Sequence, residues 1–108
     1  MRVIYHLVSP SAWEATGTAP YRAASLETEG FIHCSNQDQV APAANRFYAD
    51  QPELFALCID ASRLAGLVRD EDSGKGELFP YIYGPLDRAA VVEVRRLQRD
   101  PHGHWVFP

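Results

Sequence analysis

The run Val3-Ile4-Tyr5-His6-Leu7-Val8 decides how the fold begins, because it joins β-branched and aromatic residues without a turn former. In an extended chain alternate side chains point to opposite faces, so His6 shares a face with Ile4 and Val8. Both faces are largely apolar, which is typical of a strand that is covered on both sides. We therefore expect a central strand, with the imidazole of His6 in a mostly buried position.

Further strands follow along the chain, and short helices separate them. One helix is expected where Ser11 and Glu14 have the spacing of a capping box, and another after Ser35, a good helix cap. The second helix carries an apolar stripe at helical spacing, formed by Val40, Ala43, Ala44 and Phe47. The remaining strand-like segments are 31–35, 54–59, 67–69, 79–85, 90–97 and 104–107. Connections too short for repeated helical crossovers predict an α+β fold, with a mixed or mainly antiparallel sheet and a few short helices.

The composition is that of a globular domain. A length of 108 residues suits a single domain over 1–108, with 46% hydrophobic and 22% charged residues. Ten basic against fourteen acidic residues give a net charge of −4, which argues against an extended nucleic-acid surface. No apolar run approaches the roughly 20 residues that cross a bilayer, so no membrane span is expected. Two cysteines and a start without a signal-peptide pattern predict reduced thiols and a cytoplasmic location.

Several motifs favour structural over chemical roles. Ser73-Gly74-Lys75-Gly76 lacks the glycine spacing of a phosphate loop and predicts a flexible turn. The four histidines do not show the spacing of a metal site, so no metal is expected. Cys34 and Cys58 stand among apolar residues, which predicts packed core thiols rather than nucleophiles.

Aromatic and basic residues outside the apolar strands are also given structural roles. Trp13 and Phe47 are expected in the core. Arg95, Arg96 and Arg99 follow one another closely near the end of the chain, and we expect them on a solvated surface.

Two histidines are harder to explain by packing. His6 and His33 each lie in a short apolar strand and need hydrogen-bond partners if buried. Ser35 shares the face of His33 at a strand-to-helix junction, where free backbone N–H groups can hold an anion. Nine of the ten basic residues are arginine, whose planar fork matches phosphate and carboxylate oxygens. We expect a cleft for a phosphate-containing or otherwise anionic small molecule, bounded by His6, Arg22, His33, Ser35, Tyr81 and Tyr83.

Several motifs follow one another along nearly the whole chain. They are Ile4-Tyr5-His6-Leu7, Tyr21-Arg22 with Ser25-Leu26, Glu29-Gly30-Phe31-Ile32-His33-Cys34-Ser35, Ala44-Asn45-Arg46-Phe47-Tyr48 and Phe79-Pro80-Tyr81-Ile82-Tyr83-Gly84-Pro85-Leu86. Together they resemble the bacterial domain of unknown function 952 family, which has no established activity. Tyr81 stands where the family's Phe-Pro-His-Ile-Tyr-Gly-Pro motif has a histidine. A chemical step that needed that histidine would be altered in this chain.

The order of elements also resembles the ADP-ribosyltransferases and the RNA 2′-phosphotransferases. That resemblance implies an ADP-ribosyltransferase-like fold, with NAD as the cofactor to test. It implies that His6 holds a ribose hydroxyl of NAD, and that His33 and Ser35 belong to a second motif. It implies a phosphate contact for Arg22, with Ser25 of the same motif among the ligand-binding residues. This comparison rests on fold-level analogy.

Three functions follow as hypotheses. The first is an enzyme of ADP-ribosyl or phosphoryl transfer, with His33 as the catalytic acid, base or orienting group. The second is a non-catalytic pocket for NAD, ADP-ribose or another nucleotide or anionic metabolite. The third is a protein-interaction domain whose histidines are structural. The transferases' late glutamate is matched only by position, by Glu77 or Glu93, which favours the second over the first. The oligomeric state is left open.

Overall fold

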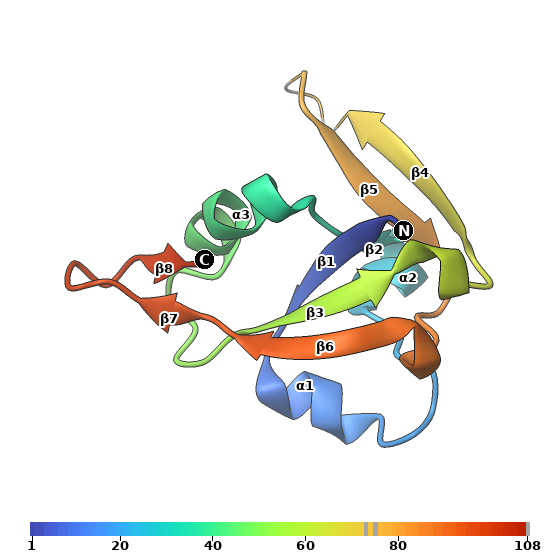
Figure 1. The fold of residues 1–108 in the computed structure, drawn as a ribbon, viewed down its shortest axis with the longest axis horizontal. Helices are drawn as coiled ribbons and strands as arrows, with labels where there is room; N and C mark the ends of the chain where they lie inside the picture. Colours follow the sequence, from blue (N-terminus) through green and yellow to red (C-terminus); the bar gives the residue numbers. More distant parts are fainter. Residues whose placement is uncertain (73, 75, 108) are drawn as a thin grey trace.

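The computed structural model describes residues 1–72, 74 and 76–107, and its strands pair antiparallel (Figure 1). The strands are β1 (Val3–Val8), β2 (Ile32–His33), β3 (Phe55–Asp60), β4 (Leu67–Asp72), β5 (Leu78–Tyr83), β6 (Val91–Arg96), β7 (Gln98–Arg99) and β8 (Trp105–Val106). The helices are α1 (Pro10–Ala15), α2 (Ala24–Thr28) and α3 (Val40–Phe47), with 3-10 turns η1 (Gln37–Gln39), η2 (Ala61–Arg63) and η3 (Arg88–Ala90). The predicted α+β fold with antiparallel sheets and few short helices is confirmed.

The centre of the first sheet is β3, which lies between β1 and β6. The prediction that Val3–Val8 is the central strand is therefore wrong. On its other side β1 has a bridge of one residue pair, Tyr5 with Ser35. The Tyr5 N–H donates to the Ser35 carbonyl at 2.8 Å, and the Ser35 N–H donates to the Tyr5 carbonyl at 2.7 Å. This bridge joins the first sheet to the second, in which β5 lies between β2 and β4.

The two faces of the first sheet pack against different parts of the chain. One face contributes Ile4 and Leu57 to a core cluster with Ile32 and Ile82 of the second sheet. The opposite face packs beneath α3 and the β7–β8 hairpin, in a second cluster. Its buried members are Tyr5, Leu7, Val40, Ala44, Leu54, Ala56, Cys58, Leu97 and Trp105. The apolar residues on both faces of β1 thus indicate that both faces are buried. They do not indicate that β1 is the central strand of its sheet.

Both helical starts differ from the sequence prediction. Ser9, and not Ser11, caps α1, and its hydroxyl oxygen accepts a backbone N–H of the first turn at 3.2 Å. Asn36, and not Ser35, caps the turn before α3, where it forms a capping box with Gln39. Ser35 is instead held in the bridge to β1, which leaves the next residue to begin the helical segment.

The apolar stripe of α3 faces the core over only part of its length. Val40 and Ala44 are fully buried, but Phe47 is 67% exposed, so its predicted core position is wrong. Phe47 is the last residue of the helix, and the guanidinium of Arg46 lies over its ring. Trp13 is partly buried and packs against the first core cluster, as predicted.

Arginine side chains cover aromatic rings across the described part of the chain. The pairs are Arg46–Phe47, Arg69–Tyr83, Arg88–Trp13, Arg95–Phe107, Arg96–Phe55 and Arg99–Trp105. The solvated surface predicted for these residues is confirmed for Arg96 and Arg99, which are exposed, whereas Arg95 is half-buried. Each of the three guanidinium groups also lies against a ring. Arg99 also donates to three backbone carbonyls. Such stacking explains why a planar cation is used in preference to lysine.

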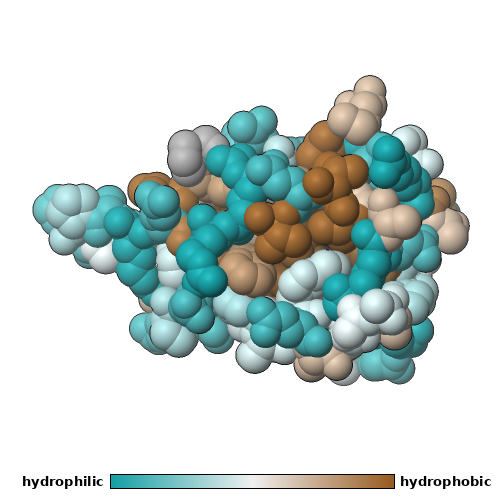
Figure 2. Space-filling model, turned by 60° about the horizontal axis from the view of Figure 1, so that its bottom comes forward, coloured by the Kyte–Doolittle hydropathy of each residue, from teal (hydrophilic) through white to brown (hydrophobic). Residues whose placement is uncertain are grey.

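The side of the molecule that carries α1 and β6 is turned forward in Figure 2, where hydrophobic residues gather in the middle and hydrophilic ones surround them. On β6, Val92 is 48% exposed and Val94 is 41% exposed. The strand predicted at 67–69 extends to Asp72 because it pairs with β5 along that length. Of the predicted turn, Ser73 and Lys75 lie outside the described residues. Within the part of the chain that is described, no helix has the length and apolarity needed to span a membrane.

Truncation of Leu57, which is fully buried on β3, is expected to lower the free energy of unfolding by about 2–5 kcal/mol, because it removes apolar contacts and leaves a cavity. Urea denaturation of Leu57→Ala measures this loss. Leu78→Ala is the matched control, since Leu78 is 53% exposed, and a change within about 0.5 kcal/mol is expected. Equal losses in the two variants would contradict the placement of the core on β3.

Candidate functional site

The imidazole of His6 is held by the backbone of His33. Its Nδ1 lies 2.6 Å from the His33 carbonyl oxygen, and because a carbonyl only accepts, Nδ1 is the nitrogen that carries the proton. His6 is 6% exposed, and burial lowers its pKa to about 4. The ring is therefore neutral near pH 7, with Nε2 as a hydrogen-bond acceptor.

A pocket of about 300 Å³ adjoins His6. Nε2 of His6 has no hydrogen-bond partner among the described residues, and it is not sealed from accessible space. The polar residues around this pocket are Ser9, Tyr21, Ser25, His33, Tyr48 and Gln51. Burial raises the pKa of both tyrosine hydroxyls, so they remain protonated donors. The small pocket therefore offers one neutral acceptor, at His6, and several hydroxyl groups, and among the described residues no arginine or lysine lines it.

His33 is paired with Glu29, at the end of α2. The His33 Nε2 lies 2.5 Å from a Glu29 carboxylate oxygen. Gly30 makes the contact possible, because its φ of +89° turns the chain back after the helix, in a region that favours glycine. Because a carboxylate only accepts, Nε2–H of His33 donates to Glu29, and Nδ1 is the ring nitrogen that this contact does not use. The edges of Phe31 and Tyr81 hold the ring in place, with centroids 4.9 and 5.0 Å away.

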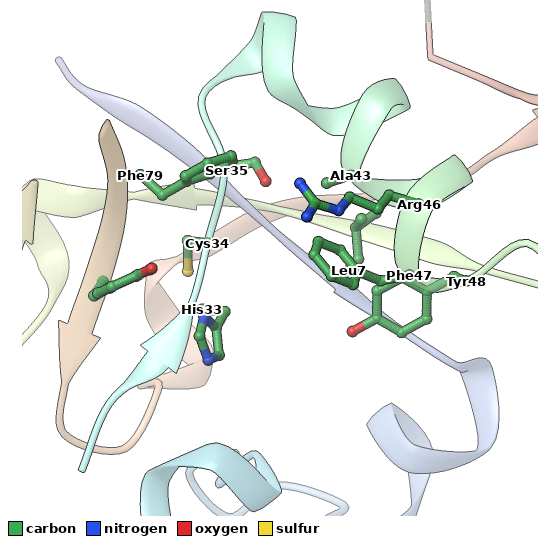
Figure 3. Close-up of a pocket in the computed structure, with 10 residues that line it drawn as sticks. Leu7, His33, Cys34, Ser35, Ala43, Arg46, Phe47, Tyr48 and Phe79 are labelled. Carbon is green, nitrogen blue, oxygen red and sulfur yellow. The ribbon is translucent and has the colours of Figure 1, made fainter. Parts of the chain in front are cut away.

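A larger pocket of about 380 Å³ lies between α3 and the strands on either side of the Tyr5–Ser35 bridge (Figure 3). Its lining is Leu7, His33, Cys34, Ser35, Ala43, Arg46, Phe47, Tyr48, Phe79 and Tyr81. Arg46 supplies a fixed positive charge, and Figure 3 shows its guanidinium reaching from α3 across the pocket towards Ser35. Most of the other lining groups are apolar or aromatic. This pocket therefore suits a flat apolar group with a negative charge beside it.

The two pockets adjoin, because Leu7, His33 and Tyr48 line both of them. The structure thus brings His6, Ser25 and His33 together at the small pocket. It places His33 with Ser35 and Tyr81 at the large one. The two imidazoles, far apart in the sequence, meet at the small pocket.

Two of the predicted site residues lie elsewhere. Arg22 is exposed and pairs with Glu27 through Nη2 at 2.5 Å, outside both pockets. Tyr83 donates its hydroxyl to Glu71, also outside both pockets. Tyr83 shares a face of β5 with Tyr81, but it lies two residues further along the strand, away from the Tyr5–Ser35 bridge. The prediction of one cleft that includes Arg22 and Tyr83 is wrong.

Two backbone N–H groups at the predicted strand-to-helix junction already have partners. The Ser35 N–H donates to Tyr5, and the Asn36 N–H donates to the Gln39 side chain at 2.8 Å. The fixed positive charge beside this junction is that of Arg46, which lines the large pocket with Ser35. Cys34 lines the large pocket but is buried, and burial raises its pKa far above the usual range. A packed core thiol is what the sequence predicted for it.

Sequence reasoning missed Glu29, Arg46 and the tyrosines of the small pocket. Glu29 and Arg46 both lie in motifs that carry the family resemblance, which was the available signal. The glutamates considered by position lie elsewhere, because Glu77 accepts from Gln39 at 3.0 Å and Glu93 is close to Cys58. Neither lines a pocket. Glu29 is the carboxylate that touches the candidate catalytic group.

The lowered pKa of His6 predicts a specific dependence of stability on pH. Between pH 6.5 and pH 4 the unfolded chain binds a proton at His6 that the folded chain does not, so stability is lost as the pH falls. From pH 7.5 to pH 4.5 this amounts to about 2–3 kcal/mol. Urea titrations of wild type and His6→Gln at both pH values isolate the difference. The exposed His104→Gln is the control, and it should keep the wild-type dependence.

The comparisons with known proteins agree with this fold. A crystal structure of protein CC0527 from Caulobacter crescentus is 28% identical, with a TM-score of 0.86 over 97% of this chain and 94% of that one. A solution NMR structure of the same protein is 29% identical, with a TM-score of 0.80 over 96% and 91% of the two chains. No curated protein matches the chain. The family described as "Protein of unknown function (DUF952)" matches residues 7–94, and the chain belongs to this family.

Proposed function

We propose that this protein binds a ribose-containing nucleotide, such as ADP-ribose or NAD, across the two adjoining pockets. The observation that carries the proposal is the position of His33. It stands in the wall that both pockets share, with an aromatic, positively charged space on one side and a neutral, hydroxyl-rich space on the other. An ADP-ribosyltransferase-like fold and a cytoplasmic location belong to the same proposal. Two free buried thiols, Cys34 and Cys58, support the location.

The large pocket suits the base and phosphate of such a ligand. Phe79 and Tyr81 supply aromatic surface, and the volume of about 380 Å³ is within the range of small-molecule sites. Arg46 can form paired hydrogen bonds to phosphate oxygens. Arg46 comes from the last turn of α3, and its guanidinium extends into the space beside Ser35 (Figure 3).

The small pocket suits the sugar. A neutral His6 does not attract a phosphate at pH 7, but its Nε2 accepts a hydrogen bond from a hydroxyl. The hydroxyls of Tyr21 and Tyr48 and the side chain of Ser25 can serve the remaining sugar oxygens. This arrangement assigns the charged end of the ligand to one pocket and the hydroxyl end to the other.

Calorimetric titration with ADP-ribose, NAD, AMP and adenosine tests the assignment. Arg46→Ala is expected to weaken ADP-ribose binding about tenfold to a hundredfold, because a charged hydrogen bond contributes about 1.5–3 kcal/mol. The affinity for adenosine, which has no phosphate, should change little in Arg46→Ala. Arg22→Ala is the matched control, since Arg22 lies outside both pockets. The affinity of this variant for ADP-ribose should stay within about twofold of wild type. If wild type binds none of the four ligands, the proposal is overturned and a protein-interaction domain is favoured.

The Glu29–His33 pair favours a second candidate, transfer of ADP-ribose from NAD to an acceptor hydroxyl. In that reaction the bond between nicotinamide and ribose breaks, the acceptor oxygen bonds to the ribose carbon, and the acceptor proton goes to Nδ1 of His33. Glu29 acts through His33, because it holds Nε2 and keeps Nδ1 available. Glu29 is then a positioning residue.

Release of nicotinamide from NAD measures this candidate directly. Glu29→Gln should lower kcat by about tenfold or more and change KM little, because an amide orients the ring less strongly than a carboxylate. Glu27→Gln is the control, since Glu27 pairs with Arg22 at the surface, outside both pockets. No release by wild type that binds NAD would exclude transfer and leave a binding protein.

A further inference from the structure

We propose that β6 pairs along its outer edge with β6 of a second copy of this chain, as an antiparallel two-fold dimer centred on Val94. The proposal concerns the opposite side of β3 from the candidate site, and it does not depend on the function proposed above. The two copies would extend β1-β3-β6 into a continuous six-stranded sheet.

The outer edge of β6 is suited to pairing. β6 pairs with β3 on one side, and within the described residues no strand lies along its other side. The strand contains neither proline nor glycine, residues that weaken an edge for pairing. Val92 and Val94 are 48% and 41% exposed on it. Figure 1 shows β6 as the outermost strand of its sheet.

The backbone of β6 offers the hydrogen-bonding groups that such pairing needs. Just after β6, the Leu97 N–H points inward and donates to the Leu54 carbonyl on the β3 side at 3.0 Å. Because N–H groups alternate in direction along a strand, those of Val94 and Arg96 point outward. Val94 of each copy can then exchange both of its backbone hydrogen bonds with Val94 of the other.

The charges along β6 select this register. With the axis at Val94, each Glu93 lies opposite Arg95 of the second copy, and this occurs twice. Moving the axis by one residue would set Glu93 against Glu93, or Arg95 against Arg95. Like charges directly opposite destabilise a sheet. The order Glu93-Val94-Arg95 is therefore self-complementary in one antiparallel arrangement.

Charge reversal gives a sharp test in the ligand-free protein. Multi-angle light scattering over a concentration series should show wild type reaching twice the 12.1 kDa of one chain. Glu93→Arg and Arg95→Glu should each weaken dimerisation at least tenfold, because each sets like charges opposite one another twice. An equimolar mixture of the two variants should form a heterodimer, since arginines of one copy then face glutamates of the other. The double swap E93R/R95E in one chain should restore the homodimer.

Thermal unfolding of every variant controls for loss of fold, which matters most at Arg95 because its guanidinium lies over Phe107. The mixing result keeps the test decisive, because only folded chains with the proposed register form the heterodimer. A wild type that stays at the mass of one chain up to about millimolar concentration overturns the proposal. So do single variants that dimerise like wild type, or a mixture that remains monomeric.

Discussion

Two backbone hydrogen bonds between Tyr5 and Ser35 hold the two sheets in the arrangement that forms the candidate site. They are the bridge through which the edge of the first sheet meets the second. Because they fix the residues just after β2 beside β1, the His33 carbonyl comes within reach of the His6 ring. His6 and His33 belong to different sheets, and this bridge holds them side by side, with Leu7 and Ser35 in the wall of the large pocket.

The sequence predicted the antiparallel α+β fold because local periodicities and short connections suffice for that. It identified His6 and His33 because polar rings in apolar strands need partners, and the structure brings them together. It did not predict which arginine faces the pocket, since that depends on how α3 packs, and it chose Arg22 over Arg46. Nor did it find Glu29, which reaches His33 only after the turn at Gly30 folds the chain back.

The polar residues of the candidate site differ in burial and in charge. The neutral His6 belongs to the interior and contributes direction rather than charge, because its proton is committed to a backbone carbonyl. Arg46 lies on the exposed end of a helix and contributes charge to the large pocket. His33 stands between them, half exposed and oriented by a carboxylate. Most other arginines are occupied by aromatic rings or by carbonyl groups, so they add rigidity and not recognition.

The backbone bridge between the two sheets is one residue pair long, and a shared apolar core lies beside it. One wall of the large pocket is formed by residues of β1 and α3, and the other by residues of β2 and β5 and the residues that follow β2. A ligand that contacts both walls therefore adds contacts between the two sheets, beside the Tyr5–Ser35 bridge. By mass action, binding of such a ligand raises the free energy of unfolding of the whole domain, and its effect is not limited to the pocket.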